Sequence, residues 1–389
     1  MASVSMAFGM LAVLVPLLAL ERGASAPLVG LIVASGHLVP ALVAVRIGRF
    51  VDQVGTHRLL LIGAWGIVLV PFLVVASPTL GVLALAQVAT GFFHVCLTVA
   101  SQALVADIGT GGSHDRNFAW YSTGLSIGQL IGPLAAGVLG DAFGLRLGFG
   151  ALAVPALVSL ACVLRMLRAP SLGHDAADRA RASTQHGVIA QTPLLAPTAM
   201  QLAVLSSCAI LIAISTRQAF LPQYMVGLDF TATSVGLVLS LRAVSSVAVR
   251  PLMPQIVRRF RGRASALAAM VFLVALGVGL LGSGATLGAL AALSLLSGIG
   301  TGVGLPLSIV TIASHVPAAE RGTALAVRLT INRFAQLVAP VVIGVLVTLV
   351  GFGVAFGLAG IGMAAVALWI ALLARSFDLA ERTAEAHSP

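Results

Sequence analysis

The sequence predicts an all-α integral membrane protein with about twelve transmembrane helices in two pseudo-symmetric six-helix bundles. Three observations predict this fold class. Of the 389 residues, 59% are hydrophobic and 9% are charged, and the mean hydropathy is +1.07, as is typical of a chain surrounded mostly by hydrocarbon. The apolar runs reach the ~20 residues that a bilayer-spanning helix needs. The two halves of the chain also resemble each other.

The apolar runs set the expected spans in chain order. The first run, MASVSMAFGMLAVLVPLLAL, lacks the basic start of a cleavable signal, so we expect it to remain as a span. The expected spans are residues 4–20, 26–46, 58–76, 79–106, 117–140, 146–168, 197–224, 232–252, 264–284, 286–313, 322–350 and 353–375. A polar cytoplasmic linker at 169–196 separates an N-terminal bundle (1–168) from a C-terminal bundle (197–375), and a cytoplasmic tail follows at 376–389.

The basic residues indicate how the chain crosses the membrane. The net charge is +10, and all 22 basic residues are arginines, most of them in short connections between spans. If the N-terminus is cytoplasmic, the opposite side holds only Arg22 and Arg146 among the connection arginines. The positive-inside rule therefore predicts that both termini lie in the cytoplasm, and we expect a bacterial cytoplasmic (inner) membrane. This distribution argues against a nucleic-acid partner.

An internal repeat relates the two halves. QLIGPLAAG (Gln129 to Gly137) and QLVAPVVIG (Gln336 to Gly344) share the pattern Q-L-x-x-P-x-x-x-G at an offset of 207 residues. GLIVAS at 30–35 matches GLVLSL at 236–241 with an offset of 206, and DRNFAW at 115–120 matches ERGTAL at 320–325 with an offset of 205. Two similar six-helix halves are the plan of a transporter that rocks around a site at the bilayer midplane.

The connection between the second and third spans, GRFVDQVGTHR, carries a family resemblance. It resembles the signature G-x-L-a-D-r-x-G-r-k of the major facilitator superfamily through Gly48, Asp52 and Gly55. The signature's arginines are missing, so Arg58 is the nearest cation. The resemblance implies a gating role for this loop, in which Asp52 exchanges partners as the halves move, with Asp107 in the same charge relay. A simple capping role for Asp52 is the alternative.

The fifth expected span contains GQLIGPLAAG, which is similar to the antiporter motif g-x-x-x-G-P-x-x-G-G of the same family. Its small residues allow close helix approach and its proline allows a bend, the residues concerned being Gly128, Gly132, Pro133 and Gly137. The motif favours export, and ordinary small-residue packing is the alternative. The whole chain is thus similar to the twelve-helix drug and metabolite exporters of the superfamily.

The intramembrane ionisable residues are cationic. No Asp or Glu falls near the middle of an expected span, whereas Arg217, Arg242, Arg328 and Arg333 lie within spans. An arginine at the bilayer centre costs at least ~2.5 kcal/mol, so it normally faces a cavity or a partner. The family resemblance puts all four on helices that line or flank a central cavity. A guanidinium suits a carboxylate or phosphate, so we expect an anionic substrate.

Three amides are expected to add hydrogen bonds to that substrate: Gln129, Asn332 and Gln336. Arg328, Asn332 and Gln336 follow at i, i+4 and i+8, which places them on one helix face. The alternative is structural, with the arginines serving as gates or donating to helix-end carbonyls. His94 and Asp107 are candidates for proton coupling, and for a lone buried histidine a packing role is the alternative.

These features favour a secondary transporter that moves a small amphipathic organic anion by alternating access, with export as the expected direction. A broad drug/proton antiporter, a facilitator and an importer are the alternatives within transport. A receptor would be expected to carry a larger soluble region, and no HExxH, GxSxG or P-loop motif is present to suggest an enzyme or an ATP-driven pump. We expect no cofactor and no metal. The expected partners are the substrate, protons and membrane lipids, with the protein itself a monomer.

Overall fold

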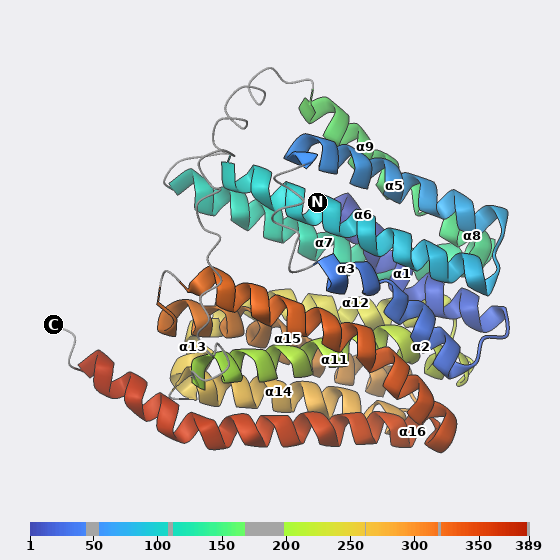
Figure 1. The fold of residues 1–389 in the computed structure, drawn as a ribbon. Coiled ribbons are helices and arrows are strands. Elements are labelled where there is room, and N and C mark those ends of the chain that lie inside the picture. The colour runs from blue at the N-terminus through green and yellow to red at the C-terminus, as the bar shows by residue number, and fades with distance from the viewer. Residues whose placement is uncertain (44–53, 108–111, 168–197, 261, 318–319, 387–389) are drawn as a thin grey trace. The chain divides into compact units, whose positions relative to one another are not determined.

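The computed structural model describes the chain except for residues 44–53, 108–111, 168–197, 261, 318–319 and 387–389 (Figure 1). The regular elements of the described residues are all helices. Hydrocarbon offers no partner to a backbone N–H or C=O, and a helix pairs these groups within itself. The all-α membrane class predicted from composition is confirmed. The predicted linker lies wholly outside the described residues.

Packing divides the chain into two compact units. Unit 1 comprises Met1–Ala24, Ser35–Ala190 and Thr231–Gly236. Unit 2 comprises Ser25–Ala34, Gln191–Phe230 and Leu237–Pro389. Each unit therefore includes one short segment from the other half of the sequence.

Unit 1 is built on long helices that are apolar along most of their length. Its helices are α1 (Ala2–Glu21), α3 (Leu38–Val43), α5 (Thr56–Ala76), α6 (Leu80–Asp107), α7 (Gly112–Phe143), α8 (Leu145–Gly150) and α9 (Ala153–Leu167). Helix α1 packs mainly against α7, and α5 packs against α6 and α9. The first turn of α12 (Ala232–Ala248) completes this unit.

Unit 2 holds the rest of α12 and the remaining helices. These are α2 (Ala26–Ser35, all but its last residue), α11 (Thr198–Val226), η3 (Arg250–Leu252), α13 (Met253–Arg259), α14 (Arg263–Gly279), η4 (Leu281–Ser283), α15 (Leu287–His315) and α16 (Arg321–Ala386). Helices α11, α14, α15 and α16 lie side by side (Figure 1), and α16 packs along both α11 and α14.

Helix lengths fit a chain that crosses a membrane many times. Within the described residues, 10 helices are long and apolar enough to span a bilayer, and α2 is a shorter apolar helix. Helix α16 covers two of the expected spans, 322–350 and 353–375. Gly351, with φ 78° and ψ 167°, separates them. The helix then continues to Ala386, through much of the expected tail.

Three expected spans are interrupted where glycine or proline weakens the helix. The span expected at 26–46 divides after Ser35, and Gly91 of α6 packs against the carbonyl of Gly36 at this break. The span expected at 146–168 divides between α8 and α9. The span expected at 232–252 leaves the α-helix after Ala248 and continues as a 3₁₀ turn around Pro251, since proline cannot donate the helical hydrogen bond.

The internal repeat is visible in the backbone. Gly144 ends α7 with φ 82°, and Gly351, 207 residues later, interrupts α16 with φ 78°. A positive φ favours glycine because it lacks a Cβ atom. The same offset that aligns QLIGP with QLVAP therefore also aligns two positive-φ glycines at helix interruptions.

The repeat also extends to close helix contacts inside each unit. In unit 1, a Cβ at Gly236 would collide with the carbonyl of Pro133. In unit 2, a Cβ at Gly30 would collide with the carbonyl of Pro340. The two glycines are 206 residues apart and the two prolines 207, so the two contacts correspond. The shared proline and glycine of the repeat thus serve backbone packing in both units.

The antiporter-like motif forms the contact between α7 and α1. A Cβ at Gly128 would collide with the carbonyl of Ala2, and one at Gly132 with the carbonyl of Met6. The Ser5 hydroxyl donates to the carbonyl of Leu125 at 2.7 Å in the same contact. These glycines let two transmembrane helices approach backbone to backbone.

Two carboxylates cap the N-termini of helices other than their own. Asp141, near the end of α7, accepts hydrogen bonds from the N–H groups of Ala232 and Thr233 at 3.0 and 2.8 Å. Asp378 accepts from two N–H groups in the first turn of α14, both at 3.0 Å, and from the Ser265 hydroxyl at 2.5 Å. The first N–H groups of a helix lack internal partners and carry partial positive charge, so both caps are stabilising.

A glycine substitution tests the α1–α7 contact. We expect Gly132→Ala to destabilise the purified protein by about 1–3 kcal/mol, because its Cβ meets backbone that has no room to move. Gly81→Ala is the matched control in the same unit, since nothing lies within 4 Å of a Cβ there. Thermal unfolding in detergent measures both. Equal unfolding temperatures for the two variants would contradict the close contact.

Candidate functional site

The polar residues of α16 share one buried face. Arg328, Asn332 and Gln336 are 7%, 2% and 8% exposed, and they follow at the i, i+4, i+8 spacing of a helix face. Helix α11 packs along α16, and α15 supplies a hydrogen-bond partner to Arg328. The charged and amide groups of α16 therefore meet protein within unit 2 instead of lipid.

Arg328 lies at the centre of a polar cluster. Its Nη2 donates to the Ser308 hydroxyl at 2.6 Å. Asn332 Oδ1 accepts from the Ser207 hydroxyl at 2.9 Å and from the Cys208 thiol at 3.3 Å. Arg328 Nε is buried and has no hydrogen-bond partner among the described residues. We call these five residues of α11, α15 and α16 the Arg328 cluster.

Arg217 forms a second cluster, on α11. Its side chain is 1% exposed, and its Nη2 donates to the Ser294 hydroxyl of α15 at 2.5 Å. Its Nε and Nη1 have no partner in the part of the chain that the structure describes. Another cation, Arg242 of α12, repels it. We call Arg217, Arg242 and Ser294 the Arg217 cluster.

Close helix packing brings Arg242 beside this part of α15. A Cβ at Gly298 would collide with the carbonyl of Arg242 and with the Ser245 hydroxyl. Gly298 lies one helical turn beyond Ser294 on α15. Helices α11, α12 and α15 thus converge around the Arg217 cluster.

The two clusters lie at different depths along the same pair of helices. Ser294 and Ser308 are 14 residues apart on α15, which corresponds to about 21 Å along the helix axis. Ser207 and Arg217 are 10 residues apart on α11, or about 15 Å. The structure therefore does not bring Arg217 and Arg328 together, and one small anion cannot touch both.

The remaining predicted substrate residues occupy other positions. Arg333 is partly buried, and its Nη1 donates to Gln336 Oε1 at 3.3 Å within α16. Gln129 is exposed on α7 of unit 1. Arg333 and Gln336 hence extend the polar face of α16, whereas a substrate role for Gln129 stays a prediction.

The proton-coupling candidates lie in unit 1. The His94 ring stacks on Phe8 with centroids 4.3 Å apart, which joins α6 to α1. Asp107 is the last residue of α6, and its side chain lies outside the described part. Stacking against an aromatic ring agrees with the packing alternative for His94, and its proton-coupling role remains a prediction.

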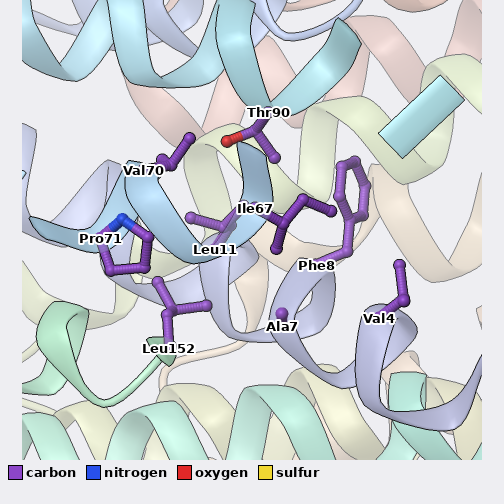
Figure 2. Close-up of a pocket in the computed structure, with 9 residues that line it drawn as sticks. All are labelled: Val4, Ala7, Phe8, Leu11, Ile67, Val70, Pro71, Thr90 and Leu152. Carbon is purple, nitrogen blue, oxygen red and sulfur yellow. The ribbon is translucent and has the colours of Figure 1, made fainter. Parts of the chain in front are cut away.

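Unit 1 contains a small apolar cavity near Phe8 (Figure 2). Its lining comes from α1, α5, α6 and the turn before α9, namely Val4, Ala7, Phe8, Leu11, Ile67, Val70, Pro71, Thr90 and Leu152. The only hydroxyl, Thr90, donates to the carbonyl of Ala86 at 2.7 Å. The space amounts to about 10 Å³, near the lower limit for one water molecule. It is a packing gap and has no polar group to orient a substrate.

The signature loop is only partly described. Gly48 and Asp52 fall outside the described residues. Gly55 precedes α5 with φ 84°, as a tight turn requires, and Arg58 is exposed. The expected charge relay through this loop therefore stays a prediction. Among the described residues, no three His, Cys, Asp or Glu side chains come together to hold a metal ion.

Sequence reasoning missed the hydroxyl partners of Arg217, Arg328 and Asn332. Ser207, Ser294 and Ser308 are fully buried and contact the polar groups described above. Nothing in their local sequence separates them from Ser206, and Ser207 and Ser308 also lie within hydrogen-bonding distance of a carbonyl of their own helix, as Ser206 does. The only available signal was their position on helices expected to line the cavity.

Known proteins with similar sequences agree with this architecture. A family model described as Major Facilitator Superfamily matches residues 1–287 and 219–388. The multidrug efflux pump LfrA of Mycolicibacterium smegmatis is 32% identical over 134 residues, 34% of this chain and 27% of that pump. The match thus spans about a quarter of that curated relative.

Solved structures share the fold across nearly the whole chain. The peptide transporter POT in complex with sulfate has a TM-score of 0.75 at 16% identity, covering 96% of this chain and 92% of its own. A POT family transporter in complex with 5-aminolevulinic acid has 0.76 at 14% identity, covering 96% and 95%. The nucleoside transporter NupG has 0.72 at 14% identity, covering 96% of both chains.

Thiol labelling tests the charge next to Cys208. In a protein with Cys96→Ser and Cys162→Ser, we expect Arg328 to favour an anionic methanethiosulfonate (sulfonatoethyl) over a cationic one (trimethylammonioethyl). Arg328→Gln should lower the ratio of the anionic to the cationic rate at least fivefold, because a neighbouring unit charge contributes about 1 kcal/mol to each rate even in water, with opposite sign for the two reagents. Arg217→Gln is the control, since it lies about 13 Å along α11 from Cys208. An unchanged ratio in Arg328→Gln would contradict the Arg328 cluster.

Proposed function

Because this chain belongs to the Major Facilitator Superfamily, we propose that it exports a small amphipathic organic anion across the cytoplasmic membrane by alternating access. The protein is a multi-pass membrane secondary transporter, and its family comprises transporters and not enzymes. The substrate class, the direction and the residues that bind the substrate are what we propose.

One observation supports the anionic substrate most strongly. Arg328 is buried beside hydroxyl and amide groups, and its Nε has no partner among the described residues. Removing a guanidinium from water costs several kcal/mol unless an anion or hydrogen bonds compensate. No described ion pair with a carboxylate satisfies Arg328. A carboxylate or phosphate of a substrate matches the planar donor set of a guanidinium.

The binding residues proposed for this substrate are those on the polar face of α16 and its partners. Arg328 would contact the acidic group, and Asn332 and Ser308 would add hydrogen bonds. Arg333 and Gln336 extend the same face by one turn. An amphipathic substrate fits because buried apolar residues lie one helical turn from these polar groups on the same three helices, namely Ala203, Ile312 and Ala324.

Export rests on two resemblances. The packing of Gly128 and Gly132 against α1 agrees with the antiporter-like motif, and the curated relative is a multidrug efflux pump. That relative also favours a second candidate, a broad drug exporter in which Arg328 and Arg333 are structural gates. The two candidates differ in the charge of the molecules transported.

The orientation is part of the proposal. The arginines in the connections favour cytoplasmic termini, with the boundary between the bundles in the polar segment at 169–196 and a monomer as the working unit. Protons are the expected coupling ion, because family members are often driven by a proton gradient.

A transport assay separates the two candidates. In proteoliposomes with an imposed pH gradient, we expect carboxyfluorescein, an amphipathic anion, to be transported in preference to ethidium, a cation. Arg328→Gln should lower the anion rate at least tenfold, since a charge-assisted contact contributes ~1.5–3 kcal/mol. Arg259→Gln, an exposed arginine of the same unit, is the matched control.

The opposite pattern would overturn the anion proposal. Transport of ethidium with full activity in Arg328→Gln and Arg333→Gln would favour the broad drug exporter. Transport of neither probe by folded protein, as judged by its unfolding temperature, would exclude both probe classes as substrates.

A further inference from the structure

The Arg217 cluster presents an unsatisfied positive charge that the proposed substrate at Arg328 cannot reach. Arg217 is almost fully buried, and two of its three guanidinium nitrogens have no partner among the described residues. We propose that this cluster is a separate binding site for a small inorganic anion of the size and charge of chloride. This inference does not rest on the proposed substrate.

The local charges require compensation. Arg217 and Arg242 repel each other, and Arg242 in turn repels Arg250. Within the described residues no ion pair joins Arg217 or Arg242 to a carboxylate. Burying one cation is expensive, and a second cation nearby raises the expense further. An anion between these donors would compensate both the burial of Arg217 and its repulsion by Arg242.

The donor set suits a halide. Arg217 Nε and Nη1 each carry an N–H without an acceptor. The Ser294 hydroxyl accepts from Arg217 Nη2, so its own proton remains available to donate to an anion. N–H and O–H donors with no carboxylate paired to them among the described residues are the chemistry that recognises a halide. The Nε–H of a guanidinium shares one edge with Nη2, the nitrogen that contacts Ser294, so an anion on that edge would meet both Nε–H and the Ser294 hydroxyl.

The enclosure limits the size of the ligand. Ser294 is 0% exposed, and the neighbouring Phe220 of α11 is also fully buried. An organic anion with an apolar body would have to displace this packing, whereas a monatomic anion needs far less room. Ser294 and Ser308 lie about 21 Å apart along α15, so a small substrate cannot fill both clusters.

Chloride-dependent stability of the purified protein tests the site. Thermal unfolding would be followed in sodium chloride, sodium bromide and sodium gluconate at equal ionic strength. We expect chloride to raise Tm saturably by about 2–4 °C over gluconate, as expected of a ligand that binds only the folded state. Equilibrium binding of radioactive chloride to the same protein provides a second measurement, with about one site per chain.

Three variants assign the effect. Arg217→Gln and Ser294→Ala should each lower chloride affinity at least tenfold, and Ser294→Ala guards against a fold lost by changing the arginine. Arg328→Gln should keep saturable chloride binding and lose at most about fivefold in affinity, because its charge acts from about 15–20 Å away. A salt effect equal in all variants, or no saturable chloride binding by the parent protein, would overturn the proposal.

The same measurements keep the two proposals apart. Loss of carboxyfluorescein transport in Arg328→Gln, with chloride binding intact, would support both. Chloride binding that disappears in Arg328→Gln but persists in Arg217→Gln would overturn the separate site while leaving the substrate proposal standing.

Discussion

The absence of hydrogen-bond partners in hydrocarbon is the constraint on which this structure depends. The backbone satisfies it by forming helices, and some small hydroxyls satisfy it by donating to their own helix, as Thr90 and Thr311 do. Exposed helix beginnings need a partner from elsewhere, which Asp141 and Asp378 supply. A guanidinium has five N–H donors and cannot return them all to its own helix. The buried arginines are therefore where the constraint is met only in part.

Much of the fold could be predicted from the sequence because it follows from composition and periodicity. Apolar length identifies the spans, and the offset of 207 residues relates Gly144 to Gly351 and Pro133 to Pro340. The predictions were least accurate where helices break, since the propensity of one glycine does not decide whether a helix bends or ends. The halves of the expected second span even belong to different units, a matter of tertiary packing that no local pattern contains.

The candidate site could be predicted only as a helix face. The spacing of Arg328, Asn332 and Gln336 determines that they share a side of α16, but the partner of each depends on the rotation and depth of other helices. Four intramembrane arginines therefore resembled a single site in sequence. Depth separates them: Arg217 pairs with Ser294 and Arg328 with Ser308, two positions far apart on one helix.

The two halves share residues that pack the helices and differ in their buried charged residues. At the repeat offset of 207, the residues that correspond to Arg328 and Arg217 are Tyr121 and Met10, neither of them charged. What the halves share is the proline and glycine of helix packing. What unit 2 adds is positive charge, placed at two depths of the α11–α15 pair.

Two positive clusters on one pair of helices must influence each other through charge. At about 15–20 Å and an effective dielectric constant of about 20, two unit charges interact by about 1 kcal/mol. An anion bound at one cluster cancels part of the field that attracts an anion to the other, so each would weaken the other by about fivefold. The coupling is reciprocal by thermodynamic necessity. If both proposed sites bind anions, this sign of coupling would suit a transporter, because an anion arriving at one depth would promote release at the other.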